Sequence, residues 1–185
     1  VPLRVLSSFE DGPGTLISYE VGRKMERAVI AGIAHNADEA KLTITGVSDH
    51  PGVAHSILGG IAEKGINVDM IIQNIAADET TDFTFTVPRA DYESAKSILA
   101  KVSDELGARG VTGDNSIAKV SIVGMGMRSH TGVADLMFAT LAEEGINIKM
   151  ISTSEIKVSV VIDDKYTELA VRALHKAFEL DKKLQ

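Results

Sequence analysis

The chain has 185 residues, of which 44% are hydrophobic, no cysteine, and a formal net charge of −7. This length supports one or two small domains with a buried core, the acidic balance argues against a nucleic-acid partner, and the lack of cysteine excludes disulfides and thiolate metal sites. Because the sequence has neither an apolar run of about 18 residues nor a basic segment followed by an apolar core at its start, it predicts a cytoplasmic protein that does not enter a membrane.

The first 27 residues do not resemble the start of a compact domain. Residues 1–6 have the apolar pattern of a strand, and residues 11–14 (DGPG) are a cluster of turn residues. Such a glycine pair can cradle a phosphate, but the Gly-Lys-Ser/Thr of a phosphate-binding loop does not follow. We therefore interpret residues 1–27 as a linker at the end of another region.

A strand, a turn, a second strand and a helix are predicted next. Residues 29–34 predict a short buried strand, residues 38–41 a solvated turn, and residues 42–46 a half-buried strand in which apolar and polar residues alternate. Pro51 fits the first helical turn, where its missing N–H costs nothing, and Gly65 fits the C-terminal cap. The buried face of this helix is an apolar stripe at helical spacing, formed by Val53, Ile57, Leu58, Ile61 and Ala62.

The remaining elements complete one folding unit. They are a strand at 67–76, a hairpin loop at 77–81, an alternating strand at 82–87, an amphipathic helix at 92–106 and an extended return at 110–115. The order is β-α-β-β-α-β, which is the split βαβ arrangement of a ferredoxin-like sandwich. The unit is then repeated, with a strand at 118–125, a helix at 132–144, strands at 147–153 and 156–162, and a helix at 166–178.

The second copy lacks its final strand, because residues 179–185 are too polar for one. The first copy has a strand to spare at 29–34, and an open sheet edge would invite aggregation. We infer that this strand completes the second sheet, so that the first unit is inserted into the second. The predicted class is α+β with antiparallel sheets and helices on one face. The predicted organisation is a linker at 1–27, a first domain at 38–116, a second domain at 28–37 plus 117–180, and a tail at 181–185.

Both copies place a glycine-containing turn at a helix start, at 49–54 (DHPGVA) and at 129–134 (SHTGVA). Backbone N–H groups at a helix N-terminus suit a carboxylate, and Asp49 offers a negative partner for an ammonium group. An anion site beside a carboxylate matches a zwitterionic amino acid. The alternative is that Asp49 only caps the helix with its side chain.

Catalytic and metal-binding patterns are weak. No pair of histidines has metal-helix spacing with a third ligand, and the G-x-G at 124–126 lacks the third glycine of a dinucleotide fingerprint. The methionines at 70, 125, 127, 137 and 150 are interpreted as core or interface filler. We predict no catalytic residue and no metal site in this chain.

Several motifs carry a resemblance to a known family. They are residues 48–52 (SDHPG), 67–74 (NVDMIIQN), 126–130 (GMRSH) and 150–159 (MISTSEIKVS). The tandem units resemble ACT domains, which are small-molecule sensing modules, and the motifs resemble the regulatory region of bacterial aspartate kinase over nearly the whole chain. The nucleotide and aspartate signature of that family, Lys-Phe-Gly-Gly-Thr, does not occur. The resemblance therefore implies a regulatory β subunit or a regulatory fragment, with ATP used only by an associated kinase domain.

The resemblance implies that threonine, lysine or both bind where ACT units of two chains pair, and that they feedback-inhibit the phosphorylation of aspartate. The implied partners are a second copy of the chain, as a homodimer, and the kinase catalytic domain or α subunit. One implied wall of the effector site comes from the first copy: Asp49, His50, Pro51, Gly52, Val53, Ala54, Asn67, Val68, Asp69 and Gln73. The other wall comes from the second copy: Val133, Ala134, Asn147, Ile148, Thr153 and Ser154.

The sequence departs from the family pattern in three places. Thr131 stands where proline is usual, Ala76 lacks a hydroxyl that many relatives carry, and the loop at 77–81 is shorter than in some relatives. Two other hypotheses stay open. One is a purely structural dimerisation module, and the other is an independent ferredoxin-like enzyme, for which no acid/base or metal constellation is found.

Overall fold

The computed structural model describes residues 3–6, 15–17, 29–75, 80–125, 127 and 132–181. A small two-stranded sheet pairs β1 (Leu3–Val5) with β2 (Thr15–Ile17). The strands of the main sheet are β3 (Val29–Ser48), β4 (Ile71–Ile75), β5 (Thr80–Val87), β6 (Gly110–Met125), β7 (Met150–Thr153) and β8 (Lys157–Asp163). The helices are α1 (Val53–Glu63), α2 (Tyr92–Glu105), α3 (Gly132–Glu143) and α4 (Thr167–Ala177), with short 3-10 turns at Arg89–Asp91 and Asp164–Tyr166.

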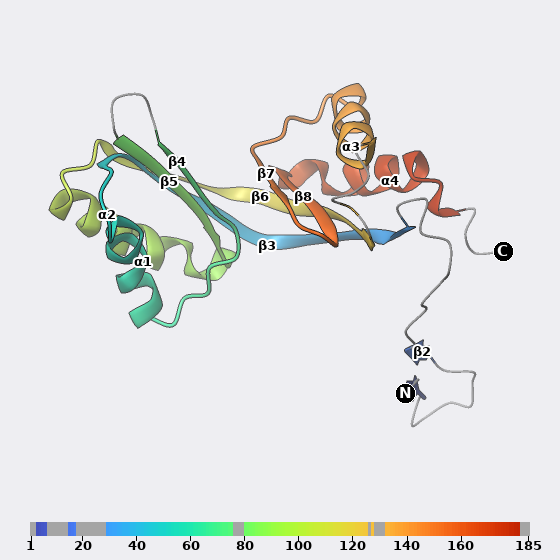
Figure 1. Ribbon diagram of the computed structural model, residues 1–185, viewed down its shortest axis with the longest axis horizontal. Helices are drawn as coiled ribbons and strands as arrows, with labels where there is room; N and C mark the ends of the chain where they lie inside the picture. Colours follow the sequence, from blue (N-terminus) through green and yellow to red (C-terminus); the bar gives the residue numbers. More distant parts are fainter. Residues whose placement is uncertain are drawn as a thin grey trace.

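The main sheet is antiparallel, with the strand order β4-β5-β3-β6-β8-β7. The two long strands β3 and β6 lie in its centre and run through both halves of the molecule (Figure 1). The second half of β3 and the first half of β6 belong to unit 1, together with α1, β4, β5 and α2. The first half of β3 and the second half of β6 belong to unit 2, together with α3, β7, β8 and α4.

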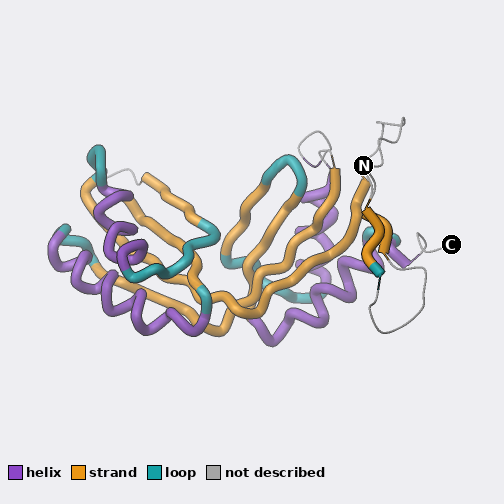
Figure 2. The backbone as a smooth tube through the Cα atoms, turned by 90° about the horizontal axis from the view of Figure 1, so that it is seen from below, coloured by secondary structure: helices purple, strands orange, loops and turns teal. Residues whose placement is uncertain are grey.

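Each unit has the strand order of a ferredoxin-like sandwich, and the strand missing from the second copy is the first half of β3. Residues Val29 to Asn36 pair with Met125 to Lys119, so the early strand completes the later sheet. The predicted fold class is confirmed, including the insertion of the first unit into the second. Figure 2 shows the consequence, since the strands continue between two groups of helices without a linker.

The predicted solvated turn at 38–41 is wrong, because β3 continues through it. Glu39 is only 3% exposed and Ala40 is buried. The Lys119 ammonium donates a hydrogen bond to Glu39 at 2.7 Å, which lets the carboxylate enter the sheet. Register shifts on both sides of Glu39 mark bulges in its pairing with β6. In the same way, the strands predicted at 110–115 and 118–125 are one strand, β6.

The predicted strands at 67–76 and 147–153 begin later than expected. Residues 66–70 and 146–149 have no regular structure before β4 and β7 start. Thr80 and Thr81, which were predicted to lie in the hairpin loop, belong to β5. Residues 76–79 of that loop lie outside the described residues.

Each unit has its own core, formed between its helices and one face of its strands. In unit 1 the α1 residues Val53, Ile57 and Ile61 pack with Phe83 and Phe85 of β5. In unit 2 the core contains Met137 and Leu141 of α3, Leu174 of α4, and Val120 and Ile122 of β6. Burying a side chain of this size contributes about 1.5–3 kcal/mol, so the two cores account for much of the stability of the fold.

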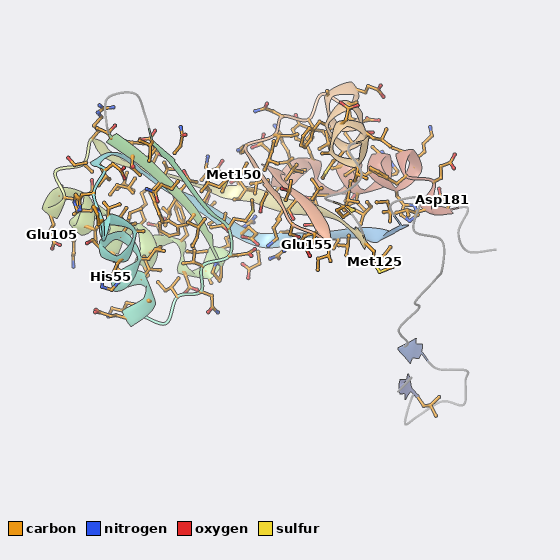
Figure 3. All side chains as sticks on the ribbon, viewed as in Figure 1. His55, Glu105, Met125, Met150, Glu155 and Asp181 are labelled. Atoms are coloured by element: carbon orange, nitrogen blue, oxygen red, sulfur yellow. The ribbon has the colours of Figure 1, made fainter. Side chains whose placement is uncertain are left out.

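A third apolar cluster lies where the units meet, and none of its described members belongs to a helix. It is formed by Met70, Ile117, Met150 and Val161, with Ile72 packed against it. Met70 and Met150 hold equivalent positions in the two repeats, and Figure 3 shows Met150 near the centre of the molecule. We call this region, centred on the β3–β6 pair Glu39–Ile117, the junction. None of the described helices is long and apolar enough to cross a membrane.

Candidate functional site

The first-copy turn is positioned by a bulge at the end of β3. Gly46 has φ of 65° and lies between Ile44 and Val47, where the pairing with β5 shifts. Its N–H donates a hydrogen bond to the Asp82 carboxylate at 2.9 Å. A Cβ atom here would lie 2.4 Å from the Arg109 side chain, so the position requires glycine. The bulge therefore fixes the direction in which the chain enters residues 49–54.

Asp49 does not cap helix α1. The N-cap is Gly52, with φ of 97° and no side-chain hydrogen bond to the helix. The Asp49 carboxylate instead accepts a hydrogen bond from the buried Thr81 hydroxyl of β5 at 3.1 Å. The capping alternative is therefore wrong. The structure holds a carboxylate beside a helix start that no side chain caps.

The other residues of this turn divide into exposed and buried groups. His50, Pro51 and Gly52 are exposed, and the His50 ring lies 3.1 Å from the Pro51 carbonyl oxygen. Val53 is buried in the unit 1 core, and Ala54 is half-buried against it. A ligand at this turn would therefore meet the side chains of residues 49–51 and the backbone of α1, but not the Val53 side chain.

The segment before β4 contains three of the predicted residues. Asn67 is exposed, and Val68 packs against the unit 1 core. The Asp69 carboxylate accepts a hydrogen bond from the Lys119 ammonium. This hydrogen bond lowers the pKa of Asp69 despite its partial burial. Gln73, farther along, is an exposed residue of β4.

The Asp69 interaction belongs to a charged group at the junction. Burial alone would lower the pKa of Lys119, but its hydrogen bonds to Asp69 and Glu39 and the negative charges of these carboxylates together outweigh that effect and raise the pKa. Asp69 therefore already has an internal partner. An incoming ammonium group would compete with Lys119 for it.

In unit 2, Val133 is buried, and Ala134 and Ile148 pack against the core. Asn147, Thr153 and Ser154 are exposed. The Ser154 hydroxyl accepts hydrogen bonds from the N–H groups of residues 156 and 157, at 3.4 and 3.2 Å, and so closes the β7–β8 turn. Residues 128–131, with the predicted looser turn at Thr131, lie outside the described residues, as does Ala76.

The first-copy turn and the β7–β8 turn lie in different units, whereas Met70 and Met150, which follow the other predicted segments, pack in one cluster at the junction. Figure 3 places His55, which follows the first-copy turn, and Glu155, which follows Ser154, in different units. The outer strands of the sheet, β4 and β7, each have one neighbouring strand. They expose Ile71 (50%), Ile75 (60%) and Ile151 (44%). Exposed strand edges of this kind are suitable docking elements for a strand of another chain.

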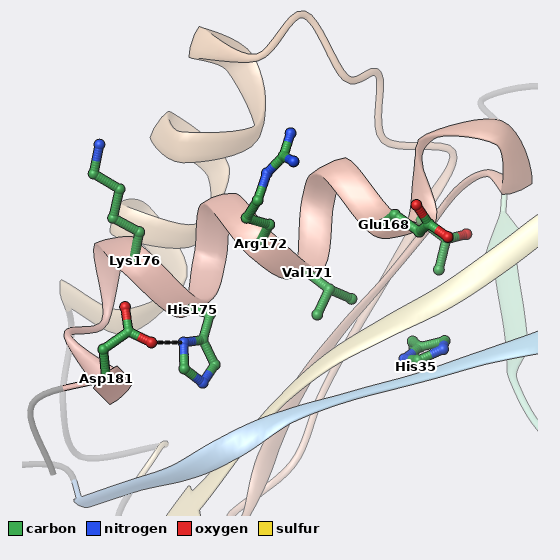
Figure 4. A pocket seen from close by; sticks show the side chains of 8 residues that line it. His35, Glu168, Val171, Arg172, His175, Lys176 and Asp181 are labelled. Carbon is green, nitrogen blue, oxygen red and sulfur yellow. Dashed lines mark ion pairs between the residues drawn. The ribbon is translucent and has the colours of Figure 1, made fainter. Parts of the chain in front are cut away.

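A pocket of about 480 Å³ lies elsewhere, between α4 and β3 of unit 2. Figure 4 shows His35 on β3 below the Glu168 and Val171 end of α4, and His175 toward the other end of that helix, where it pairs with Asp181 at 2.8 Å. Its lining residues are His35, Thr167, Glu168, Val171, Arg172, His175, Lys176 and Asp181. None of the residues predicted for effector binding lines it.

Sequence reasoning missed the residues that hold the first-copy turn and the junction. Thr81 and Asp82 were assigned to a loop and a strand without a role, although they bind Asp49 and Gly46. Lys119 and Glu39 were not singled out. The only sequence signal for Lys119 is a charge inside an apolar strand, which indicates a paired side chain without identifying its partner.

Comparisons with known proteins agree with the repeat. Models of the ACT domain match residues 41–111 and residues 120–178. The aspartate kinase of Pseudomonas putida is 66% identical over 181 residues, which are 98% of this chain and 44% of that protein. The chain thus spans less than half the length of the curated relatives it matches.

Solved structures give the same assignment. A chain in a crystal structure of aspartokinase alpha and beta subunits is 58% identical, with a TM-score of 0.76, over 82% of this chain and 99% of that one. The ligand-free regulatory subunit of aspartate kinase from Thermus thermophilus is 40% identical, with a TM-score of 0.75, over 80% of this chain and 98% of that one. The resemblance inferred from the motifs is confirmed. This chain belongs to the aspartate kinase family, in which it corresponds to the regulatory part with its two ACT domains.

Proposed function

We propose that the chain is an allosteric amino-acid sensor that binds threonine, lysine or both and feedback-inhibits aspartate kinase. The observation that carries this proposal is the first-copy turn. There the Asp49 carboxylate is held by Thr81 beside a helix start that no side chain caps. An anion-binding backbone and a fixed carboxylate, side by side, match the two charged groups of a free amino acid.

The chemistry of binding follows from this turn. The ligand carboxylate would accept hydrogen bonds from first-turn N–H groups of α1, where the helix dipole also favours a negative charge. The ligand ammonium would pair with Asp49. Exposed Asn67 and Gln73 supply polar groups for the ligand side chain. Val53 and Val68 would contact the ligand through their backbone groups, because their side chains pack against the unit 1 core.

The second wall would come from another copy of the chain. Edge strands β4 and β7 expose isoleucines and unpaired ladder positions, and such edges pair readily with another strand. A homodimer formed at these edges would bring Asn147, Thr153 and Ser154 of one chain toward the first-copy turn of the other. Binding across this interface would favour one arrangement of the two chains over another.

The regulated partner would be the aspartate kinase catalytic domain or α subunit, in the cytoplasm. That partner would use ATP to phosphorylate the side-chain carboxylate of aspartate, and we assign the catalytic groups to it rather than to this chain. An effector that binds the inhibited arrangement more tightly shifts the population toward that arrangement. The size of the shift is limited by the ratio of the effector's affinities for the inhibited and the active arrangements.

Calorimetry and thermal shift with millimolar threonine and lysine test the proposal. We expect binding heat with at least one of the two, and a Kd raised about tenfold or more by Asp49→Ala, because a charged hydrogen bond is worth roughly 1.5–3 kcal/mol. Asp104→Ala, an exposed change on α2, is the matched control and should leave the Kd unchanged. If neither amino acid gives heat or a thermal shift, the sensor function is wrong.

A purely structural dimerisation module is the second candidate, and the exposed isoleucines of β4 and β7 favour it. It predicts a dimer that forms without ligand and gains no stability from threonine or lysine. Analytical ultracentrifugation of the chain with and without each amino acid separates the two functions.

A further inference from the structure

Each unit sends one charged side chain across the junction to the other unit's half of β6. From unit 1, Asp69 accepts a hydrogen bond from Lys119, which lies in the unit 2 half of that strand. From unit 2, the Lys149 ammonium donates to Asp114 at 2.5 Å, in the unit 1 half. Two ion pairs therefore connect the units. In the first, unit 1 contributes the carboxylate, and in the second, unit 1 contributes the carboxylate on β6 while the lysine comes from the segment before β7.

The two crossing residues hold equivalent backbone positions. The N–H of Asp69 donates to the carbonyl of Thr86 at 3.1 Å, and the N–H of Lys149 donates to the carbonyl of Val161 at 2.8 Å. Each follows the exposed asparagine of its repeat by two residues. A displacement of either asparagine segment thus moves a charge whose partner belongs to the other unit.

The same segments also touch through apolar side chains. Met70 follows Asp69, Met150 follows Lys149, and both methionines are buried in the junction cluster with Ile117. Close-packed side chains transmit displacement because they leave little empty volume to absorb it. The ion pairs and the apolar cluster therefore join segments 67–70 and 147–150 into one structural element.

We propose that these crossed ion pairs couple the two units, so that a ligand held at segment 67–69 changes the affinity for a ligand at segment 147–149, and the reverse. The inference rests on the proposed function, because it takes both segments as parts of effector sites. Its physical cause is that a ligand contact repositions Asp69 or Lys149 and so alters an ion pair anchored in the other unit. Such coupling is reciprocal in binding free energy.

The test uses Asp114→Asn, which removes the cross-unit partner of Lys149 with almost no change in shape. Its matched control is Asp163→Asn, because Asp163 pairs with the same lysine from within unit 2. Lysine is titrated into the chain with and without saturating threonine. In the wild type we expect threonine to change the lysine Kd by about fivefold or more. Asp114→Asn should reduce that ratio to below about twofold, and Asp163→Asn should keep it.

A ligand-free measurement separates this inference from the proposed function. Amide hydrogen exchange is followed at the equivalent N–H groups of Asp69 and Lys149. Asp114→Asn should accelerate exchange at both by roughly threefold or more, and Asp163→Asn only at Lys149.

Three results would overturn the coupling. They are an unchanged Asp69 amide in Asp114→Asn, equal losses of the threonine effect in both variants, and a full threonine effect in Asp114→Asn. If neither amino acid binds but the exchange pattern is as expected, the structural coupling stands and the sensor function fails.

Discussion

Units 1 and 2 share the same arrangement of strands and helices, but they carry different charged residues at equivalent positions. In both, a hydroxyl pair joins the first and third strands on the face away from the core, with Thr43 and Thr84 at 2.9 Å in unit 1 and Ser121 and Ser159 at 2.8 Å in unit 2. The equivalent position just ahead of the second strand, two residues after the exposed asparagine, is Asp69 in unit 1 and Lys149 in unit 2. The repeat thus reproduces what the fold requires, while the residues that face the other unit have opposite signs.

The ion-pair groups of Asp69 and Lys149 also differ in how much they contribute to the stability of the fold. Lys119 of the Asp69 group also neutralises Glu39, a carboxylate that is almost fully buried. The partners of Lys149, Asp114 and Asp163, are both partly exposed. A buried carboxylate that loses its partner costs far more than a solvated one. The two ion-pair groups are therefore similar in geometry but unequal in their contribution to stability.

The largest expected effect tests whether the units fold together. Leu99→Ala in unit 1 and Leu141→Ala in unit 2 should each cost about 2–5 kcal/mol, because both side chains are fully buried. Since β3 and β6 run through both units, we expect each variant to unfold in a single transition. Denaturant unfolding followed by circular dichroism checks this. Two separate transitions, of which only one is displaced, would contradict a shared folding unit.

The next effect compares the two lysines. Lys119→Met should lower the free energy of unfolding by about 3 kcal/mol, because it leaves the buried Glu39 carboxylate without its cation and, among the described residues, with only the Asn36 amide as a hydrogen-bond donor. Lys149→Met should cost about 1 kcal/mol or less, because its partners are solvated. Equal losses in urea denaturation would show that the burial of Glu39 does not distinguish the two groups.

A smaller effect tests the shared framework. Gly65 and Gly145 follow α1 and α3 with φ of 69° and 67°, and neither would bring a Cβ within 4 Å of another atom. Alanine at either position should therefore cost about 1 kcal/mol through backbone strain alone. Thermal unfolding of both variants should give equal losses. A clear difference between them would mean that the two helix ends are not equivalent.

The smallest effect is the response to acid. The hydrogen bond from Lys119 lowers the pKa of Asp69. In Asp114, burial is the largest single influence and would raise the pKa, but the hydrogen bonds from Lys149 and the Ser116 N–H, together with the charges of Lys149 and Lys41, outweigh it and lower the pKa. Both pKa values are depressed on folding, so their contribution to stability is complete above the unfolded value of 3.8 and is lost as the pH falls through the folded values.

Melting temperatures measured between about pH 2 and pH 6 check this prediction. Lys119→Met should flatten the acid dependence, because Asp69 then loses the hydrogen bond that does most to lower its pKa and keeps the weaker effect of the Lys157 charge. An unchanged slope in that variant would show that Asp69 does not carry the effect.

The sequence alone determined the repeat, the element order and the insertion of one unit into the other. These follow from local signals, since apolar spacing separates helices from strands and turn residues mark their ends. Gly65 was predicted as a helix cap and has the left-handed backbone that such a cap needs. The insertion could be inferred because one copy had a strand too many and the other a strand too few.

Only the tertiary structure decided how the charged residues are used. Residues 38–41 look like a solvated turn because three of the four are charged, yet the partner of Glu39 is Lys119, far away in sequence. Asp49 looks like a helix cap because it precedes a helix, yet it binds Thr81 on another strand. A polar side chain binds the partner that the fold brings within hydrogen-bond distance. The local sequence cannot predict which distant residue that will be.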